Sequence, residues 1–91
     1  MAKTSEEALT VARKDLAERL RIDEDEITDS VEETEFPDMA LGAPEKGEMS
    51  GQMITSGWRI RLTANGTTYE YRANKRQIRL YNFKGRNWRV E

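Results

Sequence analysis

The chain contains no cysteine and no histidine. Without cysteine it has no disulfide framework, no thiolate metal site and no thiol nucleophile; without histidine it lacks the commonest general base and transition-metal ligand. No apolar run approaches the length needed to cross a bilayer, and the first residues lead into acidic ones without an apolar segment. We therefore expect a cytoplasmic protein that is not an enzyme, with no cofactor, no metal site and no membrane contact.

Ninety-one residues suffice for one domain, 1–91, with a modest core. The net charge of −2 conceals a segregation, because residues 1–57 hold six Lys/Arg against fifteen Asp/Glu, whereas residues 58–91 hold nine against two. Such asymmetry can mark a nucleic-acid-binding half. It also arises where two halves of a compact domain neutralise each other, so the charge pattern leaves both interpretations open.

The first twenty residues predict a helix. Thr4 and Glu7 fit a capping box. The apolar residues that follow form one stripe at helical spacing: Ala8, Leu9, Ala12, Leu16 and Leu20.

The acidic run Asp23 to Glu26 predicts a second capping box that opens a single helical turn. A calcium loop beginning at Asp23 would need an acid and then a glycine where Ile27 and Thr28 stand, so a solvated turn explains the run better. The polar stretch from Ile27 to Phe36 predicts an edge strand whose charges discourage edge-to-edge pairing.

The second half predicts a β-meander. A two-residue turn at Asn65-Gly66 places Ile60 opposite Tyr71 and Leu62 opposite Tyr69, with Arg61 facing Glu70 on the other side. Continuing through a turn at residues 73–76, a third strand over 77–83 would set Tyr71 opposite Ile78, Tyr69 opposite Leu80 and Arg79 beside Glu70. The tail 84–91, with Trp88 and Val90, would cover one end of the core. The predicted fold class is α+β, an N-terminal helix packed on an antiparallel β-meander of about four strands.

The long connection between the edge strand and the meander predicts a binding surface, because it holds both prolines, four of the six glycines and three of the four methionines. We expect it to engage a protein or a small ligand, although its apolar residues could equally cap the open edge of the helix–sheet sandwich. Asp38 fits a turn hydrogen bond better than a general base. The candidate binding residues are Pro37, Asp38, Met39, Leu41, Gly42, Pro44, Met49 and Gln52.

The alternative function is weak, salt-sensitive nucleic-acid binding on an exposed arginine face of the sheet. Two features count against it: Glu70 would neutralise part of the row, and the large aromatic residues alternate onto the buried face, where they cannot stack on bases. The candidate residues for this face are Arg59, Arg61, Arg72, Lys75, Arg76 and Arg79.

Several short motifs suggest a family: Pro37-Asp38, Leu41-Gly42, Pro44, Gly47, Gln52, Gly57-Trp58-Arg59-Ile60 and Tyr69-Glu70-Tyr71. They resemble a group of small bacterial proteins and lipoprotein domains of unknown function, with a Trp-Pro-Asp and a Ser-Leu-Gly-Cys-Pro loop, from the first helix to about Tyr81. The chain departs from that pattern at Phe36, Ala43, Lys46 and Tyr81. Since Ala43 and Tyr81 stand at or near cysteine positions, the resemblance implies a disulfide in exported relatives only. The layout is also loosely similar to small PepSY-type domains, an analogy of fold and not of function.

Overall fold

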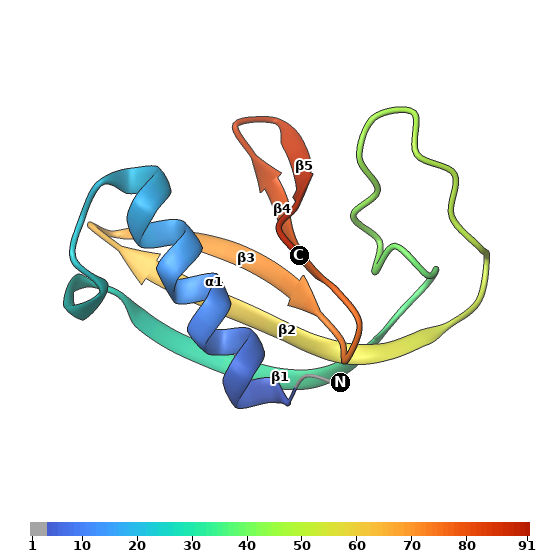
Figure 1. The fold of residues 1–91 in the computed structure, drawn as a ribbon, viewed down its shortest axis with the longest axis horizontal. Helices are drawn as coiled ribbons and strands as arrows, with labels where there is room; N and C mark the ends of the chain where they lie inside the picture. The colour runs from blue at the N-terminus through green and yellow to red at the C-terminus, as the bar shows by residue number, and fades with distance from the viewer. Residues whose placement is uncertain (1–3) are drawn as a thin grey trace.

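In the computed structural model, which describes residues 4–91, a single long helix lies across a twisted antiparallel sheet (Figure 1). The elements, in chain order, are α1 (Ser5–Leu20), the 3₁₀ turn η1 (Glu24–Glu26), β1 (Thr28–Phe36), β2 (Thr55–Ala64), β3 (Thr67–Ala73), β4 (Ile78–Phe83) and β5 (Arg86–Arg89). The α+β prediction is therefore confirmed, with five strands in place of about four. No helix within residues 4–91 has the length and apolar character that a membrane span requires.

Both predicted capping boxes are present. The Thr4 side chain accepts the N–H of Glu7 at 3.1 Å, and the Glu7 carboxylate accepts the N–H of Thr4 at 3.0 Å, which fixes the start of α1. Glu26 likewise accepts the N–H of Asp23 at 3.0 Å and closes η1. Arg21 ends α1 in the left-handed conformation with φ of 57°.

The strands follow chain order, β1-β2-β3-β4-β5, so β1 is an edge strand as predicted. The β2–β3 register is also confirmed, with Ile60 opposite Tyr71 and Leu62 opposite Tyr69. The predicted β3–β4 register was wrong by two residues, since Tyr71 pairs with Leu80 and not with Ile78. A slip of two leaves every side chain on its predicted face.

A side-chain-capped turn explains that register. The Oδ1 atom of Asn74 accepts the N–H groups of Arg76 and Gln77, at 2.8 and 3.0 Å, so that the connection closes over residues 74–77 and the first pair becomes Ala73 with Ile78. The prediction had placed the turn one residue earlier, at 73–76.

Strand β5 was not predicted. Lys84 and Gly85 both adopt positive φ, 54° and 80°, which is the geometry of a tight hairpin turn, and the chain returns as residues 86–89 against β4. Trp88 and Val90 pack against the core, as expected of the tail.

The core lies between α1 and one face of the sheet. Ala12 and Leu16 of the helix belong to one buried cluster with Ile60, Tyr71 and Leu80 of the strands. The opposite face of the sheet carries the arginines, and the connection between β1 and β2 covers part of that face. This connection, residues 37–54, is called the loop below (green to yellow in Figure 1).

Candidate functional site

The first part of the loop is a rigid turn. The Oδ1 atom of Asp38 accepts the N–H of Ala40 at 2.9 Å and the N–H of Gly42 at 3.0 Å, which confirms a turn-forming role for this carboxylate. Leu41 is completely buried, with φ of 59°. Leu41 therefore shapes the loop from within and offers no exposed side chain to a partner.

Arg72 ties this turn to the sheet. Its Nη1 atom donates to the carbonyl oxygens of Leu41 and Gly42, both at 3.1 Å, while its Nε atom donates to Glu70 at 2.8 Å. The guanidinium stacks 3.8 Å from the centre of the Tyr81 ring. Gly42 is required here because its φ is +66° and an added Cβ would lie 2.7 Å from Arg72 Nη1.

Arg79 ties down the middle of the loop. It is 2% exposed and forms a bidentate pair with Glu48, at 2.6 and 2.7 Å. It also donates to the Ala43 carbonyl at 3.2 Å and to the Gln77 side chain at 2.8 Å. The hydrogen bond from Arg79, together with the one from the Glu45 backbone, lowers the pKa of Glu48 from 4.5 to about 2.

These contacts correct the predicted arginine face in part, because Arg72 and Arg79 are not exposed. The loop covers Arg72 and Arg79, whereas Arg59 is paired with Glu32 at 2.9 Å and with Glu70 at 3.2 Å. Of the four strand arginines Arg61 is the most exposed, with 46% of its side chain open to solvent, and it lies 3.6 Å from the same Glu32 carboxylate. The expected neighbourhood of Arg79 and Glu70 is replaced by the Glu48 pair, because the register differs and the loop brings its own carboxylate.

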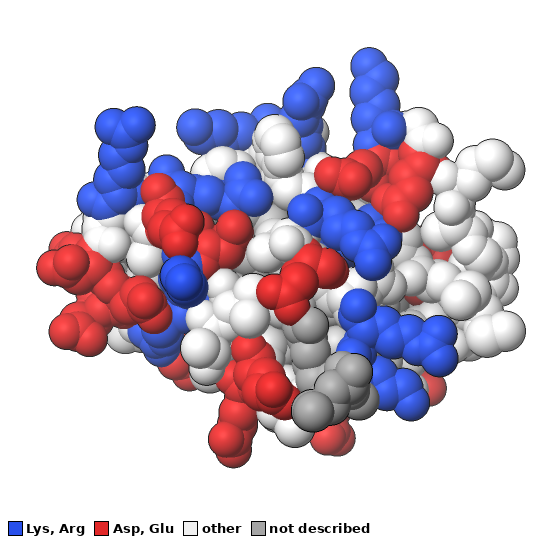
Figure 2. Space-filling view, viewed as in Figure 1, with Lys and Arg blue, Asp and Glu red and all other residues white. Residues whose placement is uncertain are grey.

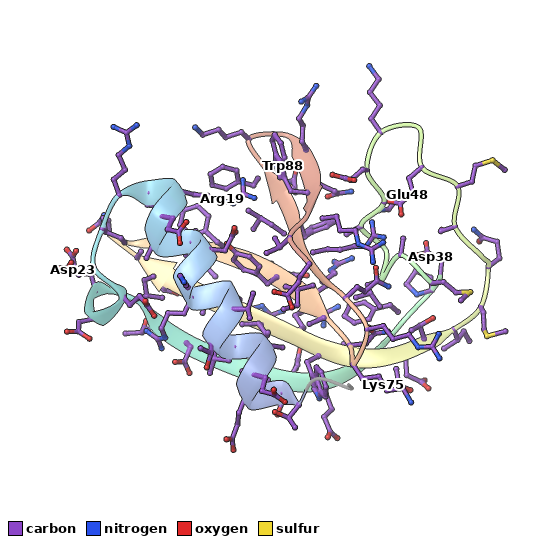
Figure 3. All side chains as sticks on the ribbon, viewed as in Figure 1. Arg19, Asp23, Asp38, Glu48, Lys75 and Trp88 are labelled. Carbon is purple, nitrogen blue, oxygen red and sulfur yellow. The ribbon has the colours of Figure 1, made fainter. Side chains whose placement is uncertain are left out.

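Lys75 and Arg76 differ from the other candidate cations. Both are exposed at the β3–β4 turn, and within residues 4–91 neither has an ion-pair partner. Figure 3 shows Lys75 where β3 ends, with Asp38 and Glu48 on the loop to one side. These two side chains are therefore free to meet an external anion.

A groove of about 840 Å³ lies beside this turn. Its apolar lining comes from Met39, Met53, Ile54 and Trp58, while residues 33–35, 55–57 and 74–77 form the rest. Three of these apolar side chains are unusually open to solvent, with exposed fractions of 46% for Met39, 64% for Met53 and 68% for Ile54. An exposed apolar lining with a few polar groups is typical of a binding site.

The wall of the groove is held in place by the sheet. Gln77, which is buried, donates from Nε2 to the Met39 carbonyl at 2.6 Å. The Met39 N–H in turn donates to the Gly51 carbonyl at 2.9 Å, which joins the two arms of the loop. The backbone of Met39 is therefore held in place before any ligand binds.

Of the eight predicted loop residues, one lines the groove and seven do not. Met39 alone lines the groove, whereas Met49 projects into solvent with 95% of its surface exposed. The remaining candidates anchor or border the loop outside the groove: Pro37, Asp38, Leu41, Gly42, Pro44 and Gln52. Met53, one of the three loop methionines that suggested a binding surface, also lines the groove, just beyond the predicted range. The groove residues that the sequence did not indicate include Ile54, Trp58 and Gln77.

Across the described part of the chain, no three acidic side chains come together in a way that could hold a metal ion.

The acidic side chains visible in Figure 2 gather mainly at the left and the bottom, whereas Lys and Arg gather along the top edge and at the lower right. The two halves of the sequence also neutralise each other in part, because Arg59 pairs with Glu32 and Arg79 pairs with Glu48.

Comparison with known families gives one match, to a family described as Domain of unknown function (DUF8738), over residues 9–81. The chain belongs to this family. The match begins within α1 and ends within β4, so every residue that lines the groove is inside it. No curated protein and no solved structure is significantly similar to the chain. The likeness to PepSY-type domains stays a prediction.

Proposed function

We propose that this DUF8738 domain is a non-catalytic binding module that uses the groove to hold a short peptide segment of a partner protein. The observation that carries the proposal is the exposure of Met39, Met53 and Ile54 around one cavity. Single exposed apolar residues are ordinary on a protein surface, but three that line the same hollow form a surface that gains free energy when it is covered.

The rigidity of the surroundings favours binding over simple capping of the core. Arg72, Arg79 and Gln77 hold the loop by its backbone, and the flexible thioethers are left to face solvent. Preorganised backbone with adaptable methionines suits recognition of varied apolar side chains, because little ordering is required on binding. Nucleic-acid binding has less support, since most of the arginines are already paired within the domain.

A displayed library of random peptides tests the proposal. Peptides that enrich on the intact chain should lose binding to Met53→Glu and to Ile54→Glu, both of which place a charge in the apolar lining. Met49→Glu is the matched control, because it makes the same change at an exposed methionine of the same loop that does not line the groove.

We expect the two groove variants to weaken binding at least about tenfold, because each removes one apolar contact and introduces a charge that must be desolvated. The Met49→Glu control should bind like the parent. Failure to enrich any peptide, or equal binding by all three variants, would contradict the proposed function.

A further inference from the structure

The groove runs beside a length of β2 that has a partner on one side only. Thr55, Ser56 and Gly57 pair with β1, but the pairing of β2 with β3 stops at Trp58 and Ala73. Beyond that point the chain turns away through residues 74–77, and no other strand of the described residues takes the vacated place. β2 therefore has a short open edge facing the groove.

The register identifies which backbone groups point toward it. Ala64 and Thr67 flank the two-residue turn and form a hydrogen-bonded pair, so alternate β2 residues, Ala64 through Trp58, direct their N–H and C=O groups to β3. The next residue in this series is Ser56. Its backbone donor and acceptor point away from β1 into the groove, and Ser56 lines that groove.

Residue 75 is the position at which a longer β3 would pair with Ser56. In the β2–β3 register, Arg61 faces Glu70 and Trp58 faces Ala73, so residue 75 would face Ser56 if β3 continued. The chain leaves the sheet before this position, and the exposed side chains of Lys75 and Arg76 lie at the end of the groove beside the open edge of β2.

From this arrangement we infer that the groove binds an extended peptide as an added strand on β2, with a carboxylate of the peptide held by Lys75 and Arg76. The inference rests on the proposed function and specifies its ligand. Backbone pairing to Ser56 sets the path of the peptide, while an apolar side chain of the peptide contacts Met53 and Ile54.

The charges favour this occupant over a second copy of the domain through its other edge. β1 carries Glu32, Glu33 and Glu35, so antiparallel pairing of two β1 strands would bring carboxylates together without compensation. The groove itself has mixed charge: Glu33 and Glu35 of β1 line one wall, whereas Lys75 and Arg76, at the end of the open edge of β2, have no ion-pair partner within residues 4–91 and attract a carboxylate.

The experiment uses a peptide enriched on the intact chain, resynthesised with single backbone N-methyl groups at successive positions. N-methylation removes one donor without changing a side chain. Strand addition predicts that methylation at the donor facing Ser56 abolishes binding, whereas methylation at neighbouring, outward-facing positions is tolerated. Tolerance at every position would overturn strand addition.

The carboxylate is tested by reversing charge at two places. Lys75→Glu with Arg76→Glu should weaken binding at least about tenfold, the combined effect of two exposed charge pairs and the repulsion that replaces them. Lys84→Glu with Arg86→Glu changes the net charge equally, on exposed residues of the β4–β5 hairpin outside the groove, and should leave affinity within about twofold. Equal effects of the two pairs would overturn the role of Lys75 and Arg76.

Amidation of the peptide distinguishes the two sources of the carboxylate: loss of binding on amidation identifies a terminal carboxylate, and retention identifies Asp or Glu. A peptide that is sensitive to Met53→Glu, but insensitive to N-methylation and to charge reversal, would leave the proposed function standing and overturn this inference. Absence of any enriched peptide would overturn both.

Discussion

Neutralising Glu48 should destabilise the domain at neutral pH, and we expect the loop to open before the rest of the domain unfolds. In the Glu48→Gln variant, Arg79 keeps its charge at 2% exposure but loses a bidentate carboxylate that lies at 2.6 and 2.7 Å. Removing one partner of a buried pair costs about 3–5 kcal/mol. Since the Glu48 side chain is itself 26% exposed and glutamine retains one acceptor, we expect about 2 kcal/mol.

That loss corresponds to a fall in Tm of roughly 8–16 °C for a domain of this size. Urea unfolding followed by tryptophan fluorescence measures it, with hydrogen exchange of residues 39–54 reporting whether the loop opens first. Glu35→Gln is the control, because Glu35 is exposed and has no ion pair within residues 4–91; its effect should stay within about 0.5 kcal/mol.

The pH dependence provides a sharper check. Because folding lowers the pKa of Glu48 from 4.5 to about 2, its contribution is complete above pH 4.5 and is lost as the pH falls toward 2. The stability difference between the parent and Glu48→Gln should therefore shrink across that window and stay constant above it. Parallel curves, or a difference below about 0.5 kcal/mol at pH 7, would refute the assignment of Arg79 and Glu48 as the anchor of the loop.

Three further changes test the fold around the site. Gly57→Ala should lower the free energy of unfolding in urea by about 3 kcal/mol, because the new Cβ would lie 2.3 Å from the Ala73 carbonyl oxygen. Gly51→Ala is the control and should cost less than about 1 kcal/mol, because its Cβ meets only the flexible thioether of Met39. Equal losses in the two variants would contradict this reasoning. Asp38→Ala should cost about 1 kcal/mol and increase exchange of the loop amides, with Asp38→Asn, which keeps the acceptor, near the parent. Burial and the hydrogen bond to the helix raise the pKa of Tyr71 above its ordinary 10.0, so stability should fall as the pH rises beyond 10, and less in Tyr71→Phe; identical alkaline profiles of the two proteins would refute this.

The sequence predicted the helix, the edge strand and the first hairpin because each rests on local chemistry. The Thr4 capping box and the Asn65-Gly66 turn specify their structures within a few residues. The β3–β4 register failed because it depends on a side chain, Asn74, that caps the turn and places it one residue later in the chain. Strand β5 was missed because Lys84-Gly85 is a weaker turn signal than Asn-Gly.

The site could be predicted only in part, since it depends on contacts between distant segments. Alternation placed Arg72 and Arg79 correctly on the polar face, but nothing local indicates that residues 41–48 fold over that face and bring Glu48 to Arg79. The sequence suggested the loop and the arginine face as two separate surfaces, but in the structure the arginines bind the loop and the two form one unit. One signal was present in the sequence: buried arginines need carboxylates and carbonyl oxygens as partners, and the loop is rich in both.

The exposed apolar groups of the loop are hard to explain by stability alone. Met53 and Ile54 are each capable of contributing about 1.5–3 kcal/mol if buried, and the domain has a small core to which such a gain would matter. The arginines bind the half of the loop that carries Leu41 and Glu48, whereas the other half lies beside the open edge of β2 and is joined to the first by the hydrogen bond from Met39 to Gly51. Covering these side chains would gain free energy, and that gain is the basis of the proposed binding function.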